Sequence, residues 1–431
     1  MDALIYAIGV IVFVLGLVIS IALHEVGHMV PAKKFGVKVT QYFVGFGKTL
    51  WSTRRGETEY GIKAIPLGGF VKLVGMLPPA KGQDPSTVRD SNTGVFTQLI
   101  ADARHAEYEH VRPGEEERLF YRKPWWQKLI VMASGPLVNI VIAAILFTVV
   151  FSGFGVPTAT TTVDGVSDCV IPAADGARAC TEEDPVAPAR DAGLRPGDQI
   201  LSFNGTMITG WDQLTGLIRD NDDGEAVIVV DRDGTEQKLS TNTSVSSRTD
   251  LDSDAFVDVG FLGVVPVAVS ERQGPVFVAA TMWDYTKATG EAIIALPQRL
   301  VQVAEAAFGG VRQENSPMSV VGASRVAGEV VTFDEASWAD RIANLIGLLA
   351  AVNLFVALFN FIPLLPLDGG HIAGTLWEAL RRGIARLRGK PDPGHVDVGK
   401  LLPVAYVVGA FLLLMGVLLI YADIVNPVRL Q

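Results

Sequence analysis

The chain has 431 residues, of which 49% are hydrophobic, and its mean hydropathy is +0.33. That composition is too apolar for an ordinary soluble enzyme of this length and indicates a membrane protein with large polar insertions. The formal net charge of −10 argues against a nucleic-acid partner, because phosphate recognition requires a basic surface stripe that this sequence does not supply.

Apolar stretches long enough to span a membrane recur along the chain. A run of about 20 apolar residues crosses a hydrocarbon core of roughly 30 Å as a helix. The charge-free stretches that reach this length are residues 3–23, 129–151, 342–367 and 401–421. We therefore predict a multi-pass α-helical membrane protein whose four transmembrane helices lie within residues 1–30, 125–155, 341–375 and 401–431. The first stretch lacks the basic start and the cleavage site of a signal peptide, so we expect it to be retained.

The first apolar stretch ends in the motif His24-Glu25-Val26-Gly27-His28. Residues four apart lie on one face of a helix, so this HExxH pattern sets two imidazoles at the spacing that zinc requires. Glu25 is then placed to act on a water polarised by the metal. The alternatives are a chance match with packed or solvated histidines, and a soluble zinc protease, which conflicts with the apolar run before the motif.

Residues 31–76 predict a membrane-associated β-hairpin region directly after the motif. The β-like runs 60–65 and 70–74 flank the turn Pro66-Leu67-Gly68-Gly69, as the two strands of a hairpin do. An exposed apolar edge beside the metal helix could pair with an extended substrate. The alternative is a surface hairpin with no substrate role.

Residues 77–124 are charged and rich in Pro, Asp and Glu, and we predict a charged cytoplasmic loop. His105 and His110 lie here, five residues apart and therefore off one helical face, so we expect them to be solvated. Trp125 and Trp126, which follow, are typical of an interfacial anchor for the second span.

Between residues 156 and 270, short β-like runs alternate with turns. A glycine-leucine turn at residues 193–194 leads into a strand that ends at Asn204-Gly205, and a helical segment follows at residues 211–219. This order resembles a PDZ domain, which binds extended peptides by adding a strand at its edge. We predict an inserted, extracytoplasmic, PDZ-like β-rich domain; a non-binding spacer is the alternative. Residues 271–340 predict an extracytoplasmic amphipathic region, with a helix over 275–308 on the outer membrane surface or packed on the β-rich domain.

The basic residues set the expected orientation. They gather after the first span and in a predicted basic loop at residues 376–400: Lys33, Lys34, Lys38, Arg122, Lys123 and Lys128, then Arg381, Arg382, Arg386, Arg388 and Lys390. Both links are expected to be cytoplasmic, which brings HExxH near the cytoplasmic end of its helix. Cys169 and Cys180 then lie on the oxidising side, which favours a disulfide; two free, buried thiols are the alternative.

Two histidines leave a catalytic zinc short of its usual three protein ligands. Asp368 ends the third apolar stretch, and the expected topology brings that end to the same side as His24. A carboxylate at a membrane boundary is a functional candidate by default. Its alternative role is an N-cap for the helix that follows.

The motifs as a set resemble the site-2 protease family, the intramembrane zinc metalloproteases of the bacterial RseP/Rip type. They are HExxH, Pro66-Leu67-Gly68-Gly69, Gly135-Pro136-Leu137-Val138-Asn139, the PDZ-like insert, and Asn360 through Leu367-Asp368-Gly369. The resemblance spans nearly the whole chain. It implies Zn2+ held by His24, His28 and Asp368.

By the same resemblance, Glu25 is the general base and Asn360 holds the substrate backbone. Asn139 would line the interior, and the segment at Gly68 and Gly69 would present the substrate as a strand. The implied activity is hydrolysis of a peptide bond within the transmembrane segment of a single-span regulator, such as an anti-sigma factor, in the lipid bilayer of a bacterial plasma membrane. The alternatives are a catalytically silent PDZ-bearing scaffold and a metal transporter, which would require more polar groups along the second and fourth spans.

Overall fold

The computed structural model describes residues 2–78, 111, 114–176, 178–250, 255–307, 309–310, 312–313, 316–333 and 336–428. The chain divides into two compact units. The first combines Met1–Phe154 with Gly274–Gln431, and the second is Gly155–Gln273. Most of the predicted loop 77–124, including His105 and His110, lies outside the described residues; its described end contains the 3-10 turns Glu116–Arg118 and Phe120–Arg122.

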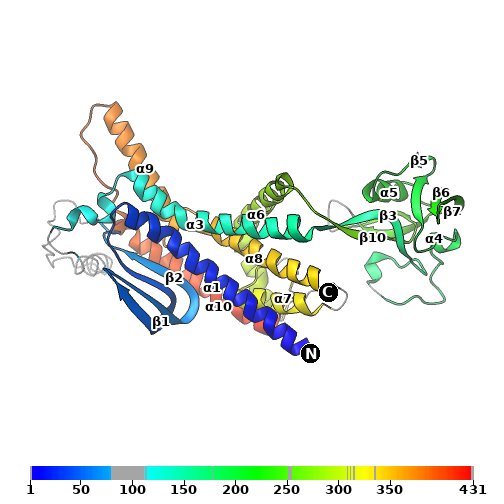
Figure 1. Ribbon diagram of the computed structural model, residues 1–431, viewed down its shortest axis with the longest axis horizontal. Coiled ribbons are helices and arrows are strands. Elements are labelled where there is room, and N and C mark those ends of the chain that lie inside the picture. The colour runs from blue at the N-terminus through cyan, green and yellow to red at the C-terminus, as the bar shows by residue number, and fades with distance from the viewer. Residues whose placement is uncertain are drawn as a thin grey trace. The chain divides into compact units, whose positions relative to one another are not determined.

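The prediction of four membrane spans is confirmed for the described residues by helix length and composition. The spans are α1 (Asp2–Lys34), α3 (Trp125–Thr148) with its π-helical continuation Val149–Phe154, α8 (Trp338–Asn360), and α10 (Leu402–Val425) after the 3-10 turn Val398–Leu401. Helix α3 packs against both α1 and α8 (Figure 1). The first unit is therefore a helical bundle in which α3 contacts two other spans.

The end of the third span differs from the expectation. Helix α8 stops at Asn360 and not at residue 375, because Pro363 and Pro366 lie just beyond it and proline cannot donate the helical hydrogen bond. A new helix, α9 (Asp368–Leu387), then begins. The predicted basic loop 376–400 is consequently helical over its first half.

Two further helices belong to the first unit: α6 (Pro275–Ala307) and α7 (Val320–Thr332). Val278 of α6 is buried in a cluster with residues of α3 and α8. Leu300 and Val303 of α6 are buried with Leu419 of α10. The alternative that this helix packs on the β-rich domain is therefore wrong, whereas its position relative to a membrane surface stays a prediction. Helix α7 packs mainly against α1.

The sheet of the first unit is formed by β1 (Val39–Arg55) and β2 (Thr58–Leu73), each of which contributes two paired segments. Residues 41–44 pair with residues 69–72 on one side and with residues 59–62 on the other. The expected hairpin around Pro66–Gly69 is therefore wrong, because its two flanking runs pair with a third segment and not with each other. Residues 69–72 form an edge of this sheet within the described part of the chain.

The second unit is rich in β-structure. Its main sheet has the order β10-β3-β4-β6-β7, with β5 paired to β4, and β8 pairs with β9 separately. The strands are β3 (Val156–Val166), β4 (Gln199–Phe203), β5 (Thr206–Met207), β6 (Glu225–Arg232), β7 (Thr235–Asn242), β8 (Ser244–Thr249), β9 (Phe256–Phe261) and β10 (Val264–Glu271). The helical segments are the turn Ala173–Asp175, α4 (Pro188–Asp191) and α5 (Trp211–Arg219). The PDZ identity of this unit stays a prediction.

The second unit has its own hydrophobic core. Alternating residues of β4 and β6 point into it, including Ile200, Ile228 and Val230, and α5 adds Leu214, as expected for strands with one buried face. Cys169 and Cys180 form a disulfide within this unit.

Candidate metal centre

Helix α1 presents both histidines of the HExxH motif on one buried face. The side chains of His24 and His28 are 10% and 8% exposed, and their Nε2 atoms lie 3.3 Å apart. The rings meet edge to face with centroids 4.9 Å apart. The two nitrogens with the geometry to bind one ion therefore already converge.

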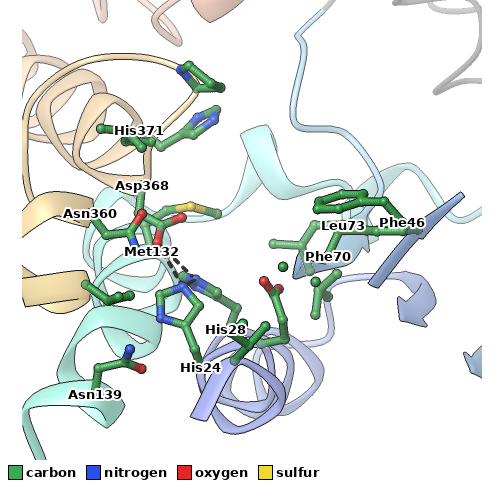
Figure 2. Close-up of a pocket in the computed structure, with 18 of the residues that line it drawn as sticks. His24, His28, Phe46, Phe70, Leu73, Met132, Asn139, Asn360, Asp368 and His371 are labelled. Carbon is green, nitrogen blue, oxygen red and sulfur yellow. Dashed lines mark hydrogen bonds and ion pairs between the residues drawn. The ribbon is translucent and has the colours of Figure 1, made fainter. Parts of the chain in front are cut away.

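Asp368 reaches the same point from the start of α9. Its Oδ2 atom lies 3.3 Å from Nε2 of His24 and 3.3 Å from Nε2 of His28 (Figure 2). The residue is the first of its helix, the N-cap position belongs to Leu367, and no side-chain cap hydrogen bond is made there. The N-cap alternative for Asp368 is therefore wrong.

The separation of these three atoms matches the requirements of zinc. Ligands about 2.0–2.2 Å from a tetrahedral zinc are themselves roughly 3.3–3.6 Å apart. His24, His28 and Asp368 offer one ligand atom each at such separations. Two imidazoles and one carboxylate, with a fourth position left for water or substrate, form a donor set typical of catalytic zinc sites.

Helix α3 orients one of the histidines. Nδ1 of His28 lies 2.8 Å from the carbonyl oxygen of Val131, which can only accept a hydrogen bond, so Nδ1 carries the proton. Nε2 is then left with its lone pair free for a metal, the usual arrangement for a ligating histidine. Nδ1 of His24 is buried and has no hydrogen-bond partner among the described residues.

A glycine contact between α1 and α3 makes room for this arrangement. A Cβ atom on Gly135 would lie 2.1 Å from Nε2 of His28, and a Cβ on Gly27 would lie 2.8 Å from the carbonyl oxygen of Ser134. Both positions therefore require glycine. The motif Gly135–Asn139 is evident in the sequence, but the space it provides for the imidazole was not predicted; the available signal was a glycine inside an apolar helix.

Glu25 faces the edge segment of the β-sheet. A Cβ atom on Gly69 would lie 2.9 Å from Cγ of Glu25, and Val71 lines the same pocket as the Glu25 carboxylate. Gly68 has a φ of +114°, and a Cβ there would lie 2.5 Å from the ring of Phe46. Gly69 thus allows the edge segment to pass close to the carboxylate, and Gly68 allows the backbone before it to pass close to Phe46.

A single pocket of about 750 Å3 collects the predicted site residues of the first unit. Its lining includes His24, Glu25, His28, Gly68, Gly69, Asn139, Asn360 and Asp368. In Figure 2, Asn360 lies beside Asp368, while Asn139 lies on the other side of the histidines and Phe46 and Phe70 face them from the sheet. Asn139 is 2% exposed, and its Oδ1 lacks a hydrogen-bond partner within the described residues.

His371 also lines the pocket, although it is not among the predicted site residues. It follows Asp368 by three positions on α9, so the two side chains share a helix face and lie close together in Figure 2. That spacing was the signal that could have identified it. The disulfide residues Cys169 and Cys180 belong to the other unit and do not line this pocket.

Comparison with known proteins agrees with the zinc-binding geometry. The model of peptidase family M50 matches residues 12–391, so the chain belongs to this family. Zinc metalloprotease Rip1 of Mycobacterium tuberculosis is 35% identical over 99% of both chains, and zinc metalloprotease Rip1 of Mycolicibacterium smegmatis is 34% identical over 99% of both chains. The regulator of sigma-W protease RasP of Bacillus subtilis is 22% identical over 96% of this chain and 98% of its own.

The protein is therefore a membrane-located zinc metalloprotease. This assignment confirms the predicted enzyme class, the resemblance to site-2 proteases and the zinc cofactor. It sets aside the catalytically silent scaffold and the metal transporter.

Proposed function

We propose that this protease hydrolyses a peptide bond within the transmembrane segment of a single-span regulator, such as an anti-sigma factor, in regulated intramembrane proteolysis. The observation that carries the proposal is the position of the HExxH pair. His24 and His28 lie at the end of the most hydrophobic span and share Oδ2 of Asp368 as a neighbour at 3.3 Å. A hydrolytic centre attached to a spanning helix suits a substrate that is itself in the membrane.

In this proposal His24, His28 and Asp368 hold the zinc. When bound, zinc polarises the scissile carbonyl and makes water more acidic. Glu25 accepts a proton from the attacking water and delivers it to the leaving amine, which is the task of a general base followed by a general acid. Asn360 and Asn139 offer amide groups to the substrate backbone; their place in the lining of the same pocket supports this role.

The edge segment 69–72 is proposed to receive the substrate. A transmembrane helix satisfies its backbone groups internally, so the segment to be cleaved must unwind and find new hydrogen-bond partners. Adding a strand to an open sheet edge supplies them. The closeness of Gly69 to Glu25, and the place of both in one pocket lining with Val71, support this edge, because a strand bound there would pass beside the carboxylate.

The predicted orientation completes the proposal. Basic residues before α3 and along α9 favour a cytoplasmic position for the metal centre and an extracytoplasmic position for the second unit. Strand β10 lies at one edge of the main sheet in that unit, which supports a PDZ-like role in screening substrates by strand addition. Such a unit would admit only membrane proteins already shortened on that side.

Glu25→Gln tests the catalytic role directly. We expect cleavage of a reconstituted single-span substrate to fall by a factor on the order of 100 to 10,000, the usual contribution of a general base, with zinc content and fold unchanged. Glu236→Gln on β7 provides the matched control and should cleave normally. Normal cleavage by Glu25→Gln would remove Glu25 from the mechanism.

The substrate class is tested separately in membranes. Cells expressing Glu25→Gln should accumulate single-span fragments that the wild-type enzyme removes, and mass spectrometry should map their missing cleavage site inside the apolar segment. Accumulation of soluble proteins alone, or cuts confined to polar loops, would contradict intramembrane cleavage.

A further inference from the structure

Helix α9 turns an apolar face away from the protein. Its large side chains Leu376, Trp377 and Leu380 are 48%, 56% and 54% exposed, and Ile384 and Leu387 are 39% and 89% exposed. At about 100° per residue these positions fall within one arc of roughly 100°. The exposed side of α9 is therefore a continuous hydrophobic stripe.

The opposite face of α9 is polar and is satisfied by the protein. Glu378 is buried and forms an ion pair with Lys128 of α3, with Nζ and Oε2 2.7 Å apart. The backbone N–H of Val396 donates to the same carboxylate at 3.2 Å, and Arg382 lies 3.4 Å from it. The apolar face of α9 is thus exposed, whereas a helix on the surface of a water-soluble protein turns its apolar face inward.

The C-terminal part of α9 and the residues after it are strongly basic. Residues 379–391 include Arg381, Arg382, Arg386, Arg388 and Lys390 and no acidic residue, in a chain whose net charge is −10. Arg386, Arg388 and Lys390 are exposed. Within the described residues none of these three forms an ion pair, so their charge is available to an external anion.

The middle of α9 lies beside the start of a spanning helix. Lys128, which pairs with Glu378, is in the first turn of the spanning helix α3. Trp125 and Trp126 at the start of α3 are 39% and 45% exposed, as is typical of the interfacial aromatic belt. In Figure 1 the far end of α9 extends beyond the start of α3. The apolar stripe and the basic end are therefore adjacent to the headgroup region.

We propose that α9 is a lipid-binding helix, with its apolar stripe in the acyl region and Arg386, Arg388 and Lys390 bound to anionic phospholipid headgroups of the same leaflet. The charge and the exposed apolar stripe fit an anionic bilayer surface, to which each basic residue adds about fivefold in affinity. If Asp368 is a zinc ligand, as proposed above, this contact would also anchor the helix that begins with that ligand. The charge of the leaflet would then affect the geometry of the metal centre.

Spin labels at single cysteines test where the stripe lies. Both cysteines of the chain are in a disulfide, so Leu380→Cys, Ile384→Cys and Arg388→Cys can each be labelled uniquely in the full-length protein in vesicles. We expect labels at 380 and 384 to be relaxed more by oxygen than by a water-soluble nickel complex, and the label at 388 to show the reverse. A label at Ser240→Cys, exposed on β7, provides the aqueous reference. Accessibility at 380 and 384 equal to that at 240 would overturn the proposal.

Headgroup preference is measured with spin-labelled phosphatidylglycerol in vesicles of phosphatidylcholine alone or in an equimolar mixture of the two lipids. The wild-type protein should bind the anionic lipid in preference to phosphatidylcholine. The variant with Arg386→Gln, Arg388→Gln and Lys390→Gln should lose about 100-fold of that preference, because three contacts of about fivefold each multiply. A control with Arg195→Gln, Lys238→Gln and Arg272→Gln makes the same charge change in the second unit and should retain it.

Equal preference in the α9 variant and the wild type would overturn the headgroup contact. Displacement of the lipid by inorganic phosphate at equal concentration would also overturn it, because the basic end would then be a site for free phosphate. If α9 bound a protein partner and not lipid, neither the oxygen accessibility at 380 and 384 nor the preference for the anionic lipid would be observed. Neither measurement depends on proteolysis, so a failure here is distinguishable from a failure of Glu25 or of the proposed substrate class.

Discussion

The metal centre of the first unit and the core of the second unit are built in opposite ways. The centre joins His24 and His28 of α1 to Asp368 of α9, two segments from opposite ends of the sequence, through three polar side chains. The core of the second unit uses many apolar side chains from one continuous stretch, such as Ile200, Leu214 and Ile228. A few long-range polar contacts therefore define the chemistry, whereas many shorter-range apolar contacts stabilise the β-rich unit.

This contrast predicts that a mutation in one region leaves the other unchanged. Asp368→Ala should have the largest effect, which is on zinc binding and proteolysis. Removing one of three ligands leaves zinc two protein donors, so we expect nearly complete loss of bound zinc and of proteolysis, measured by elemental analysis and by cleavage. Thermal unfolding of the second unit should not change. Asp284→Ala, an exposed carboxylate on α6, is the control. Full zinc retention in Asp368→Ala would remove this residue from the centre.

Leu214→Ala tests the core of the second unit. Leu214 is 0% exposed in the core of the second unit, and deleting such a side chain costs about 2–5 kcal/mol. Hydrogen exchange in the full-length protein should show faster opening of residues 155–273, with zinc content unchanged. A parallel loss of zinc would mean that the two units are energetically coupled.

Gly135→Ala probes the space around the metal ligand. The added Cβ would fall 2.1 Å from Nε2 of His28, so the imidazole must move away from its position. We expect zinc affinity to fall by about 10–100-fold, with a loss of roughly 1–3 kcal/mol in stability from overpacking. Gly347→Ala on α8, where a Cβ meets nothing within 4 Å, should leave both quantities unchanged; equal effects would refute the steric explanation.

The smallest effect is a pH dependence confined to the second unit. Burial raises the pKa of the Asp198 carboxyl, but hydrogen bonds from Arg232 and from the backbone of Arg195 outweigh it and hold that pKa below its usual value. A lowered folded-state pKa adds stability above the unfolded value, near pH 4, and that stability is lost as the pH falls through the folded-state pKa. Unfolding of residues 155–273 should ease below about pH 4 in the wild type and show less of this dependence in Asp198→Asn.

Local patterns in the sequence were sufficient for part of the metal centre. The four-residue spacing of His24 and His28 fixes both imidazoles on one face because the helix repeat is a property of the backbone alone. Span positions follow for a similar reason, since apolar length decides what can cross a bilayer. The class of enzyme followed from a set of short motifs, each of which can be recognised from neighbouring residues alone.

Such local patterns did not predict which strands pair or how α9 packs. The runs that flank Pro66–Gly69 look like hairpin strands, yet both pair with residues 41–44, because strand partners depend on which segments meet in space and not on the alternation within each run. The part of α9 beyond residue 375 was predicted as a basic loop, which is wrong, because its basic residues indicate an exposed segment and the buried partner of Glu378, Lys128, lies far away in sequence.

The sequence by itself determined which helices can span a membrane, which two histidines share a face, and which unit carries the cysteines, because these properties depend on residue type and near-neighbour spacing. Only the tertiary structure decided that Asp368 comes within 3.3 Å of both imidazoles, that Gly135 gives His28 its space, and that the edge segment passes Glu25. Those distances depend on how α1, α3, α9 and the sheet pack together, and packing is set by the whole set of contacts.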